Sequence, residues 1–314
     1  MNGDKIISKT ARRIIFYTVF IVLAILVRYA STFPAETTFT SPLSIFEPQN
    51  KVSILVVGDI MLDRNVRARI NKVGFDTFFA GVKNLISDAD IAVANLEGPF
   101  TTFRSVTDRQ EFTFTFDPAL APRLADLGFD ILGLANNHTL NFGRQGIDMT
   151  QQYIRDAGMF YYGEPNNKEE LSVVIEKNGI KVGFVGFHEF TYINFDKVLA
   201  EIDKLRPEVD ILIVSPHWGV EYQKAPTKNM QKWAHEFIDH GADAVIGAHP
   251  HIVGDTEEYN DKKIFYSLGN FVFDQYFSEE TMNGLAVVME VEKNKKIKYT
   301  TVNIRIDREG PRAY

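Results

Sequence analysis

The chain of 314 residues contains no cysteine. Its absence excludes disulfide bonds, thiolate metal ligands and a cysteine nucleophile. The chain also lacks an excess of basic residues, because 34 Lys and Arg stand against 41 Asp and Glu and the net charge is -7. A chain of this charge has no electrostatic footprint for nucleic acid, so we expect no nucleic-acid partner.

Long hydrophobic runs are also scarce, and the most prominent one extends from Ile14 to Val27 between basic residues. It is typical of a membrane anchor or a signal peptide, and a buried core helix is the third alternative. Its helical length of roughly 21 Å is short of the roughly 30 Å hydrocarbon core, although Arg28 and the residues after it extend it. Residues 29–32 offer only a weak cleavage site, which favours an uncleaved transmembrane anchor at 14–30.

The charges around this run predict its orientation. Basic residues precede it, so residues 1–13 are expected in the cytoplasm and the rest of the chain outside, as a single-pass protein of the cell membrane. Residues 31–50 contain Pro34, Pro42 and Pro48 among Ser and Thr, without periodicity. This composition predicts a linker between the anchor and one folded domain at 51–309.

In the domain, short aliphatic runs alternate with amphipathic segments, which is typical of an α/β fold with a largely parallel sheet. The expected strands are 52–57, 91–94, 131–135, 211–214 and 244–246, and the expected helices are 66–71, 78–86, 119–127, 146–157, 195–205 and 229–240. Residues 112–116 alternate strictly and predict one more strand with a Phe face on the core. The later segments 252–259, 263–268, 285–292 and 296–305 predict antiparallel hairpins.

Five polar motifs directly follow expected buried strands. They are 58–63, 95–97, 136–138, 216–221 and 249–251. Side chains just past the carboxyl ends of strands converge on one crevice in layered α/β folds. Carboxylate, carboxamide and imidazole groups are suitable ligands for a divalent cation. The arrangement therefore predicts a metal-centred active site.

Taken singly, several of these residues have a structural alternative. Asp59 is equally suited to be a metal ligand or a turn residue. Glu97 is either a metal ligand or a residue of a surface loop, and His217 is either a metal ligand or a packed core histidine. His249 and His251 form the sharpest local signal, because two imidazoles one residue apart in an extended segment can reach neighbouring ions. Asp63 is expected to cap a helix.

Other histidines carry weaker signals. His235 and His240 lie on an ordinary amphipathic helix and are expected at the surface. His188 ends an apolar run and is as suited to a structural role as to the site. His138 follows two asparagines, and its imidazole suits proton transfer.

Together these motifs, with residues 266–275, resemble the CapA family of capsule and poly-γ-glutamate biosynthesis proteins over residues 52–275. That family is similar to the calcineurin-like metallophosphoesterases. The resemblance implies a four-layer α/β/β/α sandwich and one or two divalent ions of manganese, zinc or iron. It implies the metal ligands Asp59, Glu97, Asn137, His217, His249 and His251, the proton donor His138, and the substrate-binding residues Asn136, Glu221 and Asn270.

The resemblance also implies a function. The expected reaction is metal-assisted hydrolysis or transfer on a phosphoester or an anionic polymer, with the membrane and membrane-bound synthase subunits as partners. The alternative is a non-enzymatic accessory protein that binds an anionic polymer or a synthase. Two departures favour this alternative: Met61 stands where phosphoesterases usually place a histidine ligand, and Asn141 stands where many family members have Asp.

Overall fold

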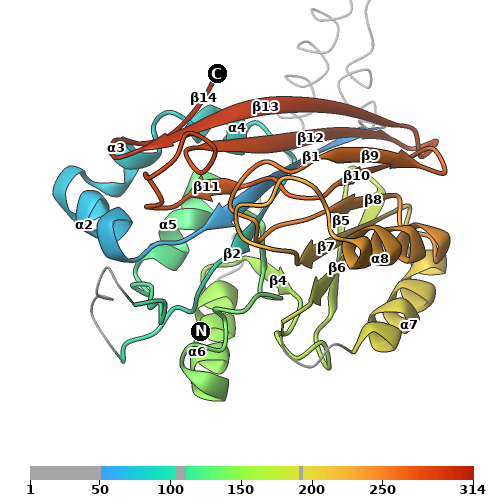
Figure 1. Ribbon diagram of the computed structural model, residues 1–314, viewed down its shortest axis with the longest axis horizontal. Coiled ribbons are helices and arrows are strands. Elements are labelled where there is room, and N and C mark those ends of the chain that lie inside the picture. Colours follow the sequence, from blue (N-terminus) through green and yellow to red (C-terminus); the bar gives the residue numbers. More distant parts are fainter. Residues whose placement is uncertain (1–50, 104–110, 191–193) are drawn as a thin grey trace, which may run out of the picture. The chain divides into compact units, whose positions relative to one another are not determined.

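The computed structural model describes residues 51–103, 111–190 and 194–314 (Figure 1). The predicted anchor at 14–30 and the linker at 31–50 lie outside these residues. Within the described ranges, no helix has both the length and the apolar character needed to cross a membrane.

The first sheet, as far as the chain is described, has eight strands in the order β14-β13-β12-β1-β2-β3-β4, with β11 beside β1. Their bounds are β1 Lys51–Ile60, β2 Ile91–Leu96, β3 Ile131–Gly133, β4 Phe160–Tyr162, β11 Asn270–Val272, β12 Asn283–Glu292, β13 Ile297–Asp307 and β14 Gly310–Ala313. Strand β1 pairs in parallel with β2 and antiparallel with β12. The sheet is therefore mixed, and its parallel part contains the strands that precede three of the polar motifs.

The second sheet follows the order β5-β6-β7-β8-β10-β9. Its strands are β5 Ser172–Lys177, β6 Ile180–His188, β7 Ile211–His217, β8 Ala244–Ile246, β9 Thr256–Tyr259 and β10 Lys262–Phe265. Strands β6, β7 and β8 are parallel, and β9 forms an antiparallel hairpin with β10. The remaining two polar motifs lie at the ends of β7 and β8.

The helices pack outside the two sheets (Figure 1). They are α2 Arg64–Val73, α3 Phe75–Phe79, α4 Lys83–Ser87, α5 Leu120–Leu127, α6 Gly143–Asp156, α7 Phe195–Leu205 and α8 Lys228–Asp239, with a short 3-10 helix at Arg206–Glu208. Helices α2 to α6 contribute to a core with the first sheet, and α7 and α8 to a core with the second.

Alternation along β1 shows how the layers are built. Leu55 and Val57 face the core under α2 to α6, whereas Ile54 and Val56 face the core between the two sheets. The layers are therefore helices, sheet, sheet and helices, and a strand such as β1 is apolar on both faces. Ile54 is fully buried, and its replacement by Ala would cost about 2–5 kcal/mol of folding free energy.

Some expected elements differ from the structure. The helix expected at 78–86 is two helices, α3 and α4, because the chain breaks around Gly81, where β14 approaches so closely that a Cβ would lie 2.7 Å from the Pro311 carbonyl oxygen. Residues 112–116 form no strand beyond an isolated bridge from Phe116 to Phe100. Phe114 and Phe116 are buried as expected, but Phe112 is exposed.

The carboxyl-terminal limit also differs from the expected domain end at 309. Strand β14 continues the first sheet to Ala313, and its turn from β13 uses Gly310 at a φ of 126°. Strands β4, β5, β6, β11 and β14 were absent from the expected set. Three of them have only three or four residues, too few for a periodic signal.

Candidate metal centre

Asp59 lies near the end of β1, in register with Asn95 of β2 and Asn270 of β11. Its backbone N–H donates to the Gly269 carbonyl oxygen at 3.1 Å. The preceding Gly58 permits this approach, since a Cβ there would lie 1.9 Å from the same oxygen. The absence of a side chain at Gly58 therefore lets the backbone of Gly269 come close to β1.

Asn95 joins the two carboxylates of the site, although it was not among the expected site residues. Its Nδ2 atom donates to Asp59 Oδ1 at 2.8 Å and also to Glu97 Oε2. Its Oδ1 atom accepts from Asn136 Nδ2 at 3.0 Å. One amide therefore holds two buried acids in place and is itself held by the next motif.

The other oxygen of Glu97 has a different environment. Glu97 is fully buried, and its Oε1 atom has no hydrogen-bond partner. The neighbouring ring nitrogens are His217 Nε2 at 3.4 Å and His138 Nε2 at 3.9 Å. Burial acts to raise the pKa of Glu97, but the neighbouring histidines, chiefly His217, hold it well below its usual value. A buried carboxylate oxygen without a donor is costly unless a cation faces it.

Three further ligand atoms, from Asn137, His217 and His249, belong to the same cluster. His217 Nε2 lies 2.9 Å from Asn137 Oδ1 and 3.2 Å from His249 Nδ1. The ligand atoms of Glu97, His217 and His249 all lie within 4.8 Å of one another. Residues from four strand ends in two sheets therefore direct oxygen and nitrogen lone pairs toward one small volume.

The segment around Pro250 is not extended, contrary to the sequence-based expectation. His249 has a φ of 97° and His251 a φ of 58°, both in the left-handed region that side chains other than glycine rarely adopt. Such residues cost of order 1–3 kcal/mol each and persist where the surrounding structure fixes them. Phe190 packs on the His249 ring at a centroid distance of 4.3 Å, and burial, then His217, lowers the pKa of His249 to about 2.

His251 lies on the other side of Pro250 and is engaged differently. Its Nδ1 atom lies 3.3 Å from Asp59 Oδ2 and 3.0 Å from Asn270 Oδ1. Burial acts to lower the pKa of His251, but the hydrogen bond and charge of Asp59 raise it. Asp59 and His251 are thus in contact at the position expected for the first metal ion.

His138 has a defined orientation. Its Nδ1 atom lies 2.9 Å from the Phe112 carbonyl oxygen, which can only accept, so Nδ1 carries the proton and Nε2 faces Glu97. Burial, chiefly, lowers the pKa of His138. The ring also packs on Phe114 at a centroid distance of 4.4 Å.

The three predicted substrate-binding residues lie in different settings. Asn136 is buried, and its Oδ1 atom accepts from His138 N, Thr139 N and Thr139 Oγ1. Asn270 is also buried and donates to the carbonyl oxygens of His251 and Thr281. Through these hydrogen bonds both amides hold the loops of the site in place, and contact with a substrate would require these hydrogen bonds to break.

Glu221, by contrast, is exposed at the rim. Its neighbour Tyr222 lies over His251 at a ring distance of 6.3 Å, and burial and Glu221 together raise the pKa of Tyr222 to about 12. Phe190 and Tyr222 are half-exposed rings beside the two site histidines. No periodic signal marks this aromatic rim in the sequence, because both residues lie just beyond strand ends.

Met61 and Asn141, the two departures from the expected pattern, have other partners. Met61 is fully buried in the core beneath α2, and its sulfur accepts from Asp63 N at 3.1 Å. Asp63 is the N-cap of α2 as expected, accepting from Arg64 N at 2.8 Å. Asn141 donates to the Phe112 carbonyl oxygen at 3.0 Å and so holds the segment that orients His138.

The remaining histidines lie where the sequence predicts them. His235 pairs with Glu257 and His240 with Asp203, both away from the predicted ligands and partly exposed. His188 is buried beside His217 at a ring distance of 6.3 Å, and burial lowers its pKa to about 3. It therefore lies behind the site as a neutral ring.

The donor set fits a divalent cation. The unpartnered Glu97 oxygen, a carboxamide oxygen and two imidazole nitrogens make a mixed oxygen and nitrogen set, which favours transition-metal ions over magnesium or calcium. Manganese, zinc and iron are all compatible with this set of ligands.

The described domain has two paired sheets with helices outside them, and it carries a buried cluster of His, Asn and Glu side chains at the strand ends. Among solved structures, the fold resembles a phosphatase of Mycoplasma pneumoniae, with a TM-score of 0.53, 18% identity and coverage of 81% of this chain and 94% of the other. It also resembles a hypothetical protein of Thermus thermophilus, with a TM-score of 0.52, 16% identity and coverage of 80% and 99%. At these identities the likeness shows the fold alone.

The sequence comparison is more specific. Residues 53–275 match the family of the bacterial capsule synthesis protein PGA_cap, and the chain belongs to this family. Relatives include the capsule biosynthesis protein CapA of Bacillus anthracis, 27% identical over 98% of this chain and 80% of its own length. The PGA biosynthesis protein CapA of Bacillus subtilis is 27% identical over 97% and 83%. The resemblance predicted from the motifs is confirmed.

Proposed function

We propose that this chain is a membrane-anchored, extracytoplasmic protein of capsule or poly-γ-glutamate synthesis or export, and that its metal centre performs hydrolysis or transfer on a phosphoester or on the anionic polymer. The observation that carries the chemical part is the buried Glu97 Oε1 atom, which lacks a hydrogen-bond donor and faces His217 and His249. Family membership supports the role in the polymer pathway.

Glu97, Asn137, His217 and His249 are the residues that would hold the ion. A divalent ion bound there supplies Lewis-acid catalysis to a phosphoryl or carbonyl group. Asn95 keeps Glu97 oriented, and the rings of Phe190 and Tyr222 lie beside His249 and His251 at the rim.

His138 is the proposed proton donor. Its Nδ1–H is committed to the Phe112 carbonyl oxygen, so a proton given to a leaving group must first be taken up at Nε2. Burial opposes this protonation and the nearby Glu97 charge favours it. An anionic substrate at the site would favour it further, because opposite charge stabilises the imidazolium.

Metal analysis of the full-length chain tests the proposal. The wild type should retain stoichiometric manganese, zinc or iron, and His249→Ala should lose both the metal and hydrolysis of a generic phosphodiester. His235→Ala, which removes a histidine far from the cluster, is the matched control and should retain both. A wild-type chain that never retains metal would overturn the chemical proposal.

A non-enzymatic accessory role is the second candidate, and one observation favours it. Met61 stands where a histidine ligand is expected and its sulfur accepts from a backbone N–H, so the position of the first ion has one ligand fewer. In this case His249→Ala should still support polymer production in cells. Loss of production on that single change would exclude the accessory role.

The location of the protein remains part of the proposal. The apolar run from Ile14 to Val27, with basic residues on its amino side, supports a single-pass anchor at 14–30 with the domain outside the cytoplasm. Protease treatment of intact protoplasts should digest the domain, whereas protection of the domain would contradict this orientation.

A further inference from the structure

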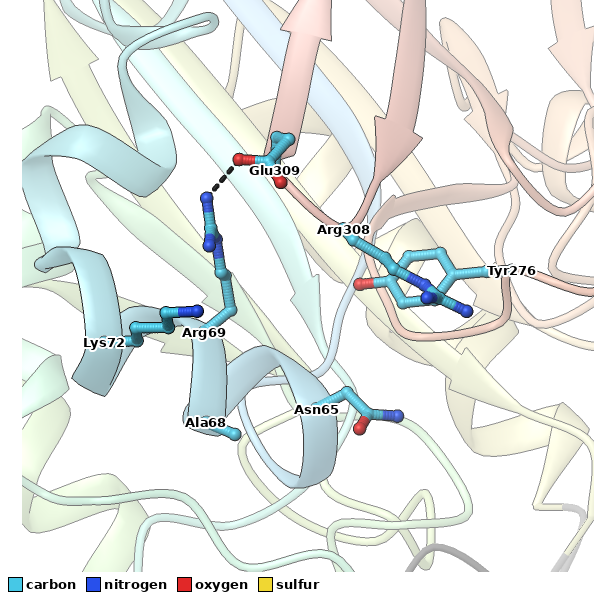
Figure 2. Close-up of a pocket in the computed structure, with 7 residues that line it drawn as sticks. All are labelled: Asn65, Ala68, Arg69, Lys72, Tyr276, Arg308 and Glu309. Carbon is cyan, nitrogen blue, oxygen red and sulfur yellow. Dashed lines mark hydrogen bonds and ion pairs between the residues drawn. The ribbon is translucent and has the colours of Figure 1, made fainter.

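A separate cavity of about 380 Å³ lies between α2 and the turn that joins β13 to β14 (Figure 2). Its lining residues are Asn65, Ala68, Arg69, Lys72, Tyr276, Arg308 and Glu309. None of the predicted metal ligands is among them. A cavity of this volume lies in the range that accepts a small ligand or a short segment of a chain.

The lining of this cavity is cationic although the chain as a whole is acidic. Arg69, Lys72 and Arg308 oppose the single acid Glu309, against a net charge of -7 for the whole sequence. Within the described part of the chain, the exposed side chains of Lys72 and Arg308 form no ion pair and no hydrogen bond. Their charge is therefore available to a ligand.

The cavity already contains one carboxylate. Glu309 forms an ion pair with Arg69, drawn as a dashed line in Figure 2. The Nε atom of Arg69 is buried without a hydrogen-bond partner, so its guanidinium has a donor that Glu309 does not use. Because the Glu309 side chain is 68% exposed, this pair is weak and open to exchange with a carboxylate from outside.

The walls of the cavity are held in place. Asn65 Nδ2 donates to Asp274 Oδ2 at 2.9 Å, which ties the start of α2 to the segment carrying Tyr276. In the turn, Glu309 N donates to Asp307 Oδ1 at 2.8 Å. Cations on fixed elements lose less conformational freedom on binding, which favours affinity.

The chain connects this cavity to the metal centre. Helix α2 follows β1, which carries Asp59, and Tyr276 follows β11, which begins at Asn270. Both walls are therefore continuations of strands that meet at the metal centre.

We propose that this cavity binds carboxylate groups of a carboxylate-rich polymer, with Arg69, Lys72 and Arg308 as the cationic contacts. The inference rests on the proposed function in one respect, the anionic polymer as ligand, and it requires neither metal nor catalysis. The cavity holds the polymer, and Glu309 occupies Arg69 when the polymer is absent.

Fluorescence anisotropy with the full-length chain and a labelled poly-γ-glutamate oligomer tests this proposal. Replacement of both unpaired cations in Lys72→Gln/Arg308→Gln should weaken binding about five- to tenfold. The matched control is Lys197→Gln/Lys228→Gln, which removes two exposed charges from α7 and α8 and should leave affinity unchanged. Glu309→Gln removes the competing carboxylate and should tighten binding about two- to threefold.

Three results would overturn the proposal. They are no binding by the wild type, equal weakening in both double variants, and binding of inorganic phosphate at this cavity without binding of the oligomer. Metal content, measured on the same preparations, separates this inference from the proposed function. The Lys72→Gln/Arg308→Gln variant should keep the wild-type metal content, so loss of metal and loss of polymer binding are distinguishable failures.

Discussion

Asn95 Nδ2 donates a hydrogen bond of 2.8 Å to Asp59 Oδ1 and so joins the ends of the neighbouring strands β1 and β2. The same nitrogen donates to Glu97, so two buried carboxylates share one amide donor. Asn95 therefore fixes the positions of the two carboxylates relative to each other without the help of a cation.

Replacement of Asn95 tests this role. In Asn95→Ala the two carboxylates lose their shared donor, so we expect a roughly 10- to 100-fold loss of metal affinity and about 1–3 kcal/mol of stability. Asn95→Asp should lower the stability of the metal-free protein further, because it places a third carboxylate beside Asp59 and Glu97. Competition with a chromophoric chelator and thermal unfolding measure the two effects. Asn303→Ala, at an exposed strand position, is the control, and equal metal affinity in both Ala variants would contradict the prediction.

The number of ions per chain is a second prediction. Met61 offers no ligand at the Asp59 end, so the wild type should bind one ion tightly through Glu97, Asn137, His217 and His249. Elemental analysis after dialysis should give about one ion per chain, the number that one such ligand set holds. Two ions retained with similar affinity would show that the Asp59 end rearranges to complete a second site.

Gly58 should tolerate no side chain. In Gly58→Ala, a Cβ would lie 1.9 Å from the Gly269 carbonyl oxygen and force β1 away from that segment. We expect a loss of about 1–3 kcal/mol or more, together with weaker metal binding because Asp59 moves. Gly179→Ala has open space around it at a φ of 74° and should cost about 1 kcal/mol from backbone strain alone. Chemical denaturation compares the two, and a smaller loss in Gly58→Ala would refute the argument.

Glu257 should contribute stability that disappears in acid. Burial acts to raise its pKa, but hydrogen bonds from Tyr266 and His235 hold it below the ordinary value of 4.5. A depressed carboxyl pKa stabilises the fold above the unfolded value, near 4.5, and this contribution is lost as the pH falls through the folded value. Because the group is partly exposed, the effect is below about 1 kcal/mol.

Thermal unfolding of the wild type and Glu257→Gln at two pH values checks the sign. The variant should melt at a lower temperature than the wild type at pH values above 4.5, and the difference should shrink in more acidic buffer. A difference that grows on acidification would contradict it.

The buried parallel strands and the clustered motifs were predictable from sequence because both depend on short-range pattern. A run such as 52–57 is apolar on both faces, and the polar residues directly after it have to lie at the sheet edge. The helix cap at Asp63 and the surface positions of His235 and His240 follow from equally local signals.

What the sequence left undetermined depends on contacts between distant segments. The role of Asn95 requires knowledge that β1 and β2 are in register, and the left-handed backbone of His249 and His251 follows from how their loop is held. The alternation at 112–116 predicted the burial of Phe114 and Phe116 but was wrong about a strand and about Phe112. The segment serves instead to present the Phe112 carbonyl oxygen to His138.

The ligand atoms that converge on Glu97 come from both sheets, with Glu97 and Asn137 following strands of the first, and His217 and His249 at strand ends of the second. A bound ion would thus be a cross-link between two halves of the domain that otherwise meet mainly through apolar side chains. Such a cross-link couples the halves in unfolding, since ligand binding stabilises only the state in which all its contacts exist. Removal of the metal would then weaken the packing between the two sheets before either sheet unfolds.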